Sequence, residues 1–210
     1  MASIKSASKV TNADTLPPVD LAPLPHGGDL AAARALFPGA PEPFLDLSTG
    51  INPNPYPVPQ LAPEIFAKLP KASDTQALAE AAAHAYGAPS YRHVCPAPGT
   101  QILLASLARL LPPGRARILT TTYAEHARAA ALAGHEVQGV DDIEALADAD
   151  LALVVNPNNP DGRVVSKETL LALAHRLHGR VGLLIVDEAF MDGGPEAASL
   201  SGEVARGNIV

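Results

Sequence analysis

The sequence has little cysteine and no long apolar run, and each absence excludes a class of protein. With Cys95 alone, an internal disulfide framework is impossible, and the cytoplasm is the simplest compartment to expect. We expect Cys95 to be a small buried side chain, because no neighbouring charge in the sequence would activate its thiol. No stretch of 18 apolar residues occurs, so the sequence predicts no membrane span.

Positive charge is also scarce, because 15 basic residues stand against 22 acidic ones and the formal net charge is −7. There is no basic run, which argues against nucleic acid as a partner. Arg115 and Arg117 are expected to be ordinary solvated side chains, and we expect no metal site. What the chain does have is a hydrophobic content of 47%, enough to bury a sizeable core.

Proline is concentrated near the N-terminus, where 13 of the 21 prolines lie within the first 70 residues. We expect residues 1–25 to form a flexible leader and residues 26–72 an N-terminal arm or small-domain segment. Within this segment, "HGGDLAAARALFPG" predicts a short helix. Alternate prolines in "NPNPYPVP" then predict an extended stretch that lies over another surface.

From residue 73 to residue 210, helical and strand patterns alternate. Continuous apolar strands in such an alternation indicate an α/β domain whose mainly parallel sheet is covered by helices on both faces. The "GNIV" at the end resembles the opening of one more strand, so we expect the chain to stop within a domain. Strands are predicted at 115–120, 135–140, 151–155 and 181–190, and helices at 73–87, 99–112, 123–134, 142–149 and 166–179.

Ligands of an open parallel sheet bind at the carboxyl ends of its strands, and polar segments lie at two such ends here. Residues 156–162 ("NPNNPDG") follow one strand, and Asp187 with Glu188 ends another. A third polar segment, Gly99-Thr100-Gln101, begins a helix whose free N–H groups suit a phosphate. Each of these alone is commonly an ordinary turn or cap.

In combination, "NPNNPDG" followed by "VDEAF" resembles the large domain of fold-type-I pyridoxal-phosphate enzymes. The resemblance extends over nearly the whole chain from His26 onward. It implies pyridoxal 5'-phosphate as the cofactor, with Asp187 holding the pyridine nitrogen protonated and the Asn159 amide donating to the phenolic oxygen. Tyr123 falls where the family places an aromatic ring stacked on the cofactor, although a core tyrosine is the alternative.

The same resemblance gives roles to several glycines. Gly99, Thr100 and Gln101 would hold the cofactor phosphate, mainly through backbone N–H groups. Gly50, in "STGINP", matches a position whose backbone lies beside the substrate carboxylate, where a side chain would intrude.

The segments "HGGD", "LDLSTGINPNPYPVP", "PAPGTQ", "TYAEH" and "DEAFMD" resemble the threonine-phosphate decarboxylases of the cobalamin pathway. This branch converts L-threonine O-3-phosphate, a phosphorylated amino acid, into (R)-1-aminopropan-2-yl phosphate. It implies that His26 and the backbone of Gly27 and Gly28 bind the substrate phosphate, with Asn159 also facing the substrate. A histidinol-phosphate-type aminotransferase is the alternative.

Several positions depart from these relatives. Phe190 stands where the aminotransferases have a tyrosine that bonds the phenolic oxygen, which favours the decarboxylase. Leu69 replaces a tyrosine that reaches across the dimer, which weakens the evidence for the homodimer that the family implies. His126 replaces a second aromatic, and the sequence does not show with what effect.

The lysine that forms the Schiff base in this superfamily would lie beyond Val210, so we expect no catalytic residue in this chain. We therefore expect a C-terminally incomplete enzyme that is inactive alone. A non-catalytic fragment is the third reading. The lysines present are Lys5, Lys9, Lys68, Lys71 and Lys167, none in the expected Ser/Lys-rich context.

Overall fold

The structure is a computed structural model that describes residues 27–210. The described residues divide into two compact units, 27–71 and Ala72–Val210. The leader expected at residues 1–25 and the phosphate ligand expected at His26 lie outside the described residues.

Residues 27–71 contain two short helices and no buried side chain. Helix α1 (Leu30–Leu36) begins at Asp29, whose carboxylate accepts a hydrogen bond from the Ala32 N–H at 2.9 Å, and α2 spans Glu64–Ala67. The proline-rich stretch between them has no regular structure. Large apolar side chains stay exposed, Leu45 at 82% and Leu69 at 91%, so this segment has no core of its own.

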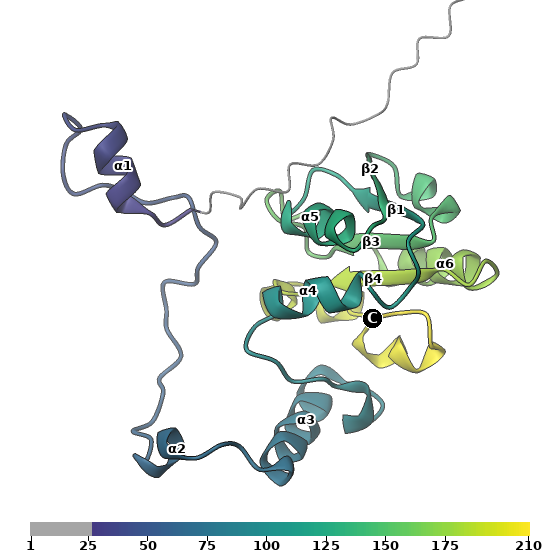
Figure 1. The fold of residues 1–210 in the computed structure, drawn as a ribbon, viewed down its shortest axis with the longest axis horizontal. Helices are drawn as coiled ribbons and strands as arrows, with labels where there is room; N and C mark the ends of the chain where they lie inside the picture. Colours follow the sequence, from purple (N-terminus) through teal and green to yellow (C-terminus); the bar gives the residue numbers. More distant parts are fainter. Residues whose placement is uncertain (1–26) are drawn as a thin grey trace, which may run out of the picture. The chain divides into compact units, whose positions relative to one another are not determined.

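The sheet lies in the second unit and is parallel throughout (Figure 1). Its strands are β1 (Arg115–Leu119), β2 (Glu136–Val140), β3 (Leu151–Val155) and β4 (Leu183–Asp187), in the order β2-β1-β3-β4. The helices of this unit are α3 (Ala72–Tyr86), α4 (Gln101–Leu107), α5 (Glu125–Leu132) and α6 (Lys167–His178), with 3-10 turns η1 (Tyr91–His93), η2 (Ile143–Asp148), η3 (Met191–Gly193), η4 (Glu196–Ala198) and η5 (Ser201–Arg206).

Two hydrophobic clusters show that helices cover both faces of the sheet. Ala152 and Val154 of β3 pack with α6 and η2, whereas Leu151, Leu153 and Val155 pack with side chains of α5 and the end of α4. Successive strand residues point to opposite faces, which explains why one continuously apolar strand supplies both clusters. The predicted parallel sheet with helices on both faces is confirmed.

Two of the expected helices differ in the structure. Residues 143–148 form a 3-10 helix, and α4 ends at Leu107 rather than continuing to Pro112. After Leu107 the chain tightens, because the N–H of Leu110 bonds the Leu107 carbonyl in an i to i−3 pattern. Pro112 and Pro113 lack an N–H and disfavour helical backbone at the residues before them, so the helix cannot continue to Pro112.

Two expectations about single side chains are wrong. Cys95 is exposed, not buried. Arg117 is only 8% exposed, not solvated, and its Nε lies 3.9 Å from Asp148 Oδ1. A long aliphatic stem can be buried along a sheet while the guanidinium reaches a carboxylate at the rim, and this is the arrangement of Arg117.

The expected extra strand at "GNIV" is seen as a parallel bridge between Leu184 and Ile209. The Leu184 N–H donates to the Asn208 carbonyl at 3.0 Å, and the Val186 N–H donates to the Val210 carbonyl at 2.8 Å. Residues 208–210 therefore run along the outer edge of β4.

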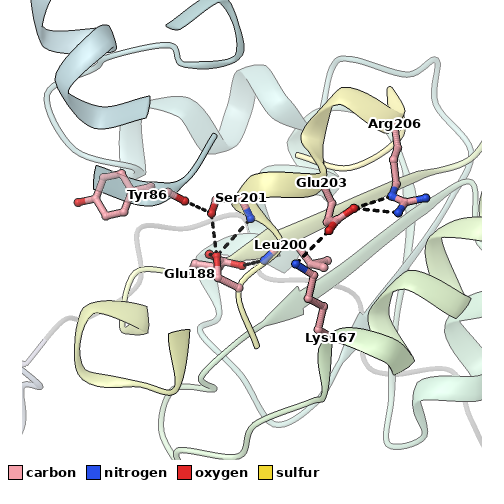
Figure 2. A network of polar contacts seen from close by, with 8 residues as sticks. Tyr86, Lys167, Glu188, Leu200, Ser201, Glu203 and Arg206 are labelled. Carbon is pink, nitrogen blue, oxygen red and sulfur yellow. Dashed lines mark hydrogen bonds and ion pairs between the residues drawn. The ribbon is translucent and has the colours of Figure 1, made fainter. Parts of the chain in front are cut away.

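Figure 2 shows how the end of β4 is tied to α3. One Glu188 oxygen accepts from the Leu200 N–H at 2.6 Å and the other from the Ser199 hydroxyl at 2.7 Å. The Ser199 hydroxyl also contacts that of Ser201, which donates to the Tyr86 carbonyl. Glu188 thus anchors a polar path from the sheet to the last turn of α3.

The same view shows a second tie, from η5 to the start of α6 (Figure 2). Glu203 lies 3.0 Å from Lys167 Nζ and 2.8 Å from Arg206 Nη2. Both cations hold the pKa of Glu203 below its usual value, with the Lys167 hydrogen bond the larger cause.

Candidate active site

The carboxyl ends of β3 and β4 lie side by side. Val155 is the register partner of Asp187, and the next N–H, that of Asn156, donates to the Asp187 carbonyl at 2.8 Å. The loop that begins at Asn156 therefore leaves the sheet directly beside the Asp187 carboxylate, as the strand-end argument predicts.

The Asp187 carboxylate is held from two sides. Its side chain is 12% exposed, its Oδ2 lies 2.8 Å from His126 Nε2, and its Oδ1 accepts from the Ala189 N–H at 3.0 Å. Burial raises the pKa of Asp187, but the hydrogen bonds from His126 and Ala189 and the charge of His126 outweigh burial, so this pKa lies below its usual value. The carboxyl group is therefore ionised at neutral pH, and His126 Nε2 is the donor.

His126 also contacts Asp187, although the sequence shows it only as a replacement for an aromatic residue of the family. It lies in the first turn of α5, is 1% exposed, and meets the Tyr123 ring edge-on with centroids 5.8 Å apart. Its spacing from Tyr123 is the sequence signal that points to it, because residues three apart at the start of a helix lie on the same side.

Tyr123 extends this set of contacts to α4. Its hydroxyl donates to Gln101 Oε1 at 3.1 Å. A chain of contacts therefore runs from Gln101 through Tyr123 and His126 to Asp187. Burial, and then the charges of Glu125 and Asp187, raise the pKa of Tyr123, which keeps its phenol neutral and able to donate. We call these four residues the strand-end cluster, and three of the six expected cofactor residues belong to it.

The three asparagines of the loop after β3 have different surroundings. Asn156 is fully buried, and its amide bonds the Val165 backbone twice, at 2.8 and 3.1 Å. Asn158, 4% exposed, uses its amide oxygen and nitrogen in three hydrogen bonds. Asn159 is half-buried, and its side chain forms no hydrogen bond with any residue of the described 27–210. Of these three asparagines, only Asn159 has an amide side chain without a hydrogen bond to residues 27–210.

The turn after Asn159 is closed by local hydrogen bonds. The Gly162 N–H donates to the Asn158 carbonyl at 2.8 Å, and Gly162 has a φ of +71°, a left-handed conformation that favours glycine. Asp161 Oδ1 accepts from the Arg163 N–H at 3.0 Å. The peptide bonds Asn156–Pro157 and Asn159–Pro160 are both cis.

The expected phosphate segment lies at the start of α4. Gly99 has a φ of +88°, and Thr100 takes the N-cap position without bonding any backbone N–H through its side chain. Thr100 and Gln101 are exposed, and Gln101 is bound to Tyr123. The structure thus connects this segment with the strand-end cluster through one side chain.

The expected substrate-binding glycines lie in the other unit. The Gly28 N–H donates to Ser48 Oγ at 2.8 Å, and a Cβ at Gly27 would overlap the Ser48 carbonyl oxygen. The "GG" and "STG" segments therefore lie against each other, and Gly27 has no space for a side chain. Gly50 is exposed, two residues beyond Ser48.

Within residues 27–210, no three His, Cys, Asp or Glu side chains are grouped as a metal site would require. In the same residues, no helix has both the length and the apolar content to cross a bilayer.

Comparison with known proteins finds relatives that match most of this chain. A threonine-phosphate decarboxylase of Sinorhizobium sp is 41% identical over 191 residues, which cover 90% of this chain and 57% of the relative. The threonine-phosphate decarboxylase of Pseudomonas aeruginosa is 42% identical over 178 residues, covering 83% and 52%. The chain thus spans about half the length of the curated relatives it matches.

Solved structures support the fold. The crystal structure of histidinol-phosphate aminotransferase from Sinorhizobium meliloti in complex with pyridoxal-5'-phosphate has a TM-score of 0.55 and 25% identity, and the match covers 64% of this chain and 40% of that one. The expected fold, that of the large domain of fold-type-I enzymes, is confirmed. The family model of aminotransferase class I and II matches residues 50–209, and the chain belongs to that family.

Proposed function

We propose that the whole protein is a pyridoxal-phosphate-dependent decarboxylase of L-threonine O-3-phosphate, with (R)-1-aminopropan-2-yl phosphate as its product in cobalamin biosynthesis. The observation that carries the proposal is the 41–42% identity to two threonine-phosphate decarboxylases over most of the chain. The strand-end cluster supports it, because its groups match what this cofactor needs.

The residues present fit the cofactor. When bound, pyridoxal phosphate acts as an electron sink for the electron pair that the departing carboxyl group leaves behind. Asp187, ionised and held by His126, has lone pairs left to keep a proton on the pyridine nitrogen. The unpaired amide of Asn159 would donate to the phenolic oxygen, and Tyr123 would lie against the ring.

The phosphate groups would bind at two glycine segments. The first-turn N–H groups after Gly99, with Thr100 and Gln101, would hold the cofactor phosphate. The substrate phosphate would bind His26 and the backbone of Gly27 and Gly28.

Phe190 separates the two candidate reactions. It is 41% exposed and has no hydroxyl group with which to bond the phenolic oxygen. Asn159 would then be the hydrogen-bond donor to that oxygen from this loop region. This difference from the aminotransferases supports decarboxylation.

The experiment uses the protein made from its complete reading frame, loaded with pyridoxal phosphate. We expect it to release carbon dioxide from L-threonine O-3-phosphate and to transfer no amino group from histidinol phosphate to 2-oxoglutarate. Amino transfer without carbon dioxide release would replace the proposal with the aminotransferase. The 1–210 chain is the control, and borohydride should trap no adduct on a specific lysine in it, because none of its five lysines stands in the Ser/Lys-rich context that the family implies.

We also propose that the whole protein is a homodimer of the cytoplasm. Residues 27–71 expose large apolar side chains, among them Tyr56 at 82% and Phe66 at 77%, which supports burial of this segment against a second copy of the protein. The single cysteine supports a reducing compartment. Light scattering of the whole protein tests the dimer, and a monomeric mass would exclude it.

A further inference from the structure

We propose that Asn158 is a positioning residue that fixes the loop carrying Tyr123 against the loop carrying Asn159. This proposal rests on the proposed function, since it concerns how two cofactor-binding groups are held in register. Neither comparison nor motif gives Asn158 a role of its own.

The Asn158 amide lies between the two loops. Its Oδ1 accepts from the Thr122 hydroxyl at 2.7 Å, and its Nδ2 donates to the Thr121 carbonyl at 2.8 Å. Nδ2 donates its other hydrogen to Asp161 Oδ1, also at 2.8 Å. Thr121 and Thr122 immediately precede Tyr123, and Asp161 follows Asn159 by two residues, so a single side chain joins both segments.

The backbone of Asn158 adds to this role. Its N–H donates to the Arg163 carbonyl and its carbonyl accepts from the Gly162 N–H, both at 2.8 Å. The residue is therefore fixed in its own loop before its side chain reaches the other. With 4% exposure, these hydrogen bonds are shielded from water, and an unpaired partner in such a place is costly.

Arg163 is a second connection between the same loops. Its Nη2 donates to the Thr120 carbonyl at 3.0 Å, while its N–H is bound to Asp161. Its Nε is buried and has no hydrogen-bond partner among the described residues. The guanidinium contact is thus incompletely satisfied, whereas the Asn158 amide uses both donors and its oxygen, and Asn158 is the stronger connection.

Asn156 provides the matched control. It has the same side chain, lies in the same loop and is equally buried, but its amide bonds only Val165 and does not reach residues 120–123. If the crossing contact matters, the variants Asn158→Ala and Asn156→Ala should lose comparable stability and differ in the state of Tyr123.

The first readout needs no cofactor. The chain has no tryptophan and four tyrosines, so the difference in near-ultraviolet circular dichroism between wild type and Tyr123→Phe isolates the Tyr123 signal. We expect Asn158→Ala and Thr122→Val to remove most of it, Thr122→Ser to restore it by keeping the hydroxyl, and Asn156→Ala to retain it. An unchanged signal in Asn158→Ala, or an equal loss in Asn156→Ala, would overturn the proposal.

The second readout uses the whole protein and pyridoxal phosphate. Asn158→Ala should raise the cofactor Kd about tenfold, the equivalent of about one buried hydrogen bond, and reduce the induced dichroism of the bound cofactor per molecule bound. Wild-type protein that binds no pyridoxal phosphate would reject the proposed function, while the tyrosine signal still decides the role of Asn158. Wild-type binding with an unaffected Asn158→Ala variant would reject only the present inference.

Discussion

At the scale of single residues, the site depends on a carboxylate kept ionised although it is largely buried. Asp187 has two donors, one from the imidazole of His126 and one from the Ala189 backbone. Burial alone would favour the neutral acid, and these donors reverse that effect.

For the whole protein, Asp187→Ala should lower kcat by about 100-fold or more, because in the proposed role this charge opposes deprotonation of the pyridine nitrogen. Phe190→Tyr should stay within a few-fold of wild type, because it adds a hydroxyl and removes no contact of the cluster. Both are measured as carbon dioxide release from L-threonine O-3-phosphate. Normal turnover in Asp187→Ala would refute the role assigned to this carboxylate.

The pH dependence of stability follows from the sign of the same pKa shift. The folded-state pKa of Asp187 lies below the ordinary 3.8, so the ionised group stabilises the fold above pH 3.8, and this contribution is lost as the pH falls through the folded-state pKa. At neutral pH, wild type should exceed Asp187→Asn by about 1–3 kcal/mol in unfolding free energy. Urea titrations at successive pH values should show this gap closing at acidic pH, and a constant gap would contradict the assignment.

At the scale of the elements, helices α3, α5 and α6 end in the same hydrogen-bonding pattern, but the type of residue that takes the left-handed conformation differs. Gly87 takes this conformation after α3 and Gly134 after α5, as the glycine stops in the sequence predict. After α6 the Gly182 N–H bonds the Leu177 carbonyl, which places Val181 at the left-handed position with a φ of +61°. A β-branched residue is strained there.

Val181→Gly should therefore raise the free energy of unfolding by about 1 kcal/mol, as the relief of left-handed strain exceeds the extra entropy of an unfolded glycine. Val181 is 84% exposed, so little packing is lost. Val181→Ala is the control and should gain much less, because alanine keeps the Cβ that causes the strain. Denaturant unfolding measures all three, and a loss of stability in Val181→Gly would show that the strain is absent.

The elements also show what the sequence could predict. Apolar periodicity, the Ser166 cap and the glycine stops locate the strands and most helices, because these signals act within a few residues. The strand-end rule in turn placed Asp187 beside the asparagine loop. Contacts such as that of His126 with Asp187, 61 residues away, depend on packing that no local pattern encodes. The exposure of Cys95 was missed for the same reason.

At the scale of the whole molecule, α3 is tied to the end of β4 by the polar path that runs through Glu188 (Figure 2). This residue follows Asp187 directly, and its carboxylate holds Ser199 and Leu200. The tie is short and polar, and regions held in this way open before the core does.

Glu188→Ala should lower the free energy of unfolding by about 1–3 kcal/mol, because the Leu200 N–H and the Ser199 hydroxyl lose a partly buried, charged acceptor. It should also speed limited proteolysis near residues 86–100. Glu203→Gln is the matched control. It removes a more exposed ion pair with Lys167 and Arg206 and should leave the proteolysis rate near that of wild type. Equal cleavage of both variants would contradict a special role for Glu188.

The exposed thiol of Cys95 makes this opening observable. As the sole cysteine of the sequence, it accepts a maleimide fluorophore at one defined position, between η1 and α4. A dye there reports on the stretch that joins α3 to the sheet without any engineered substitution. Its emission would record detachment of that stretch in real time, separately from melting of the core.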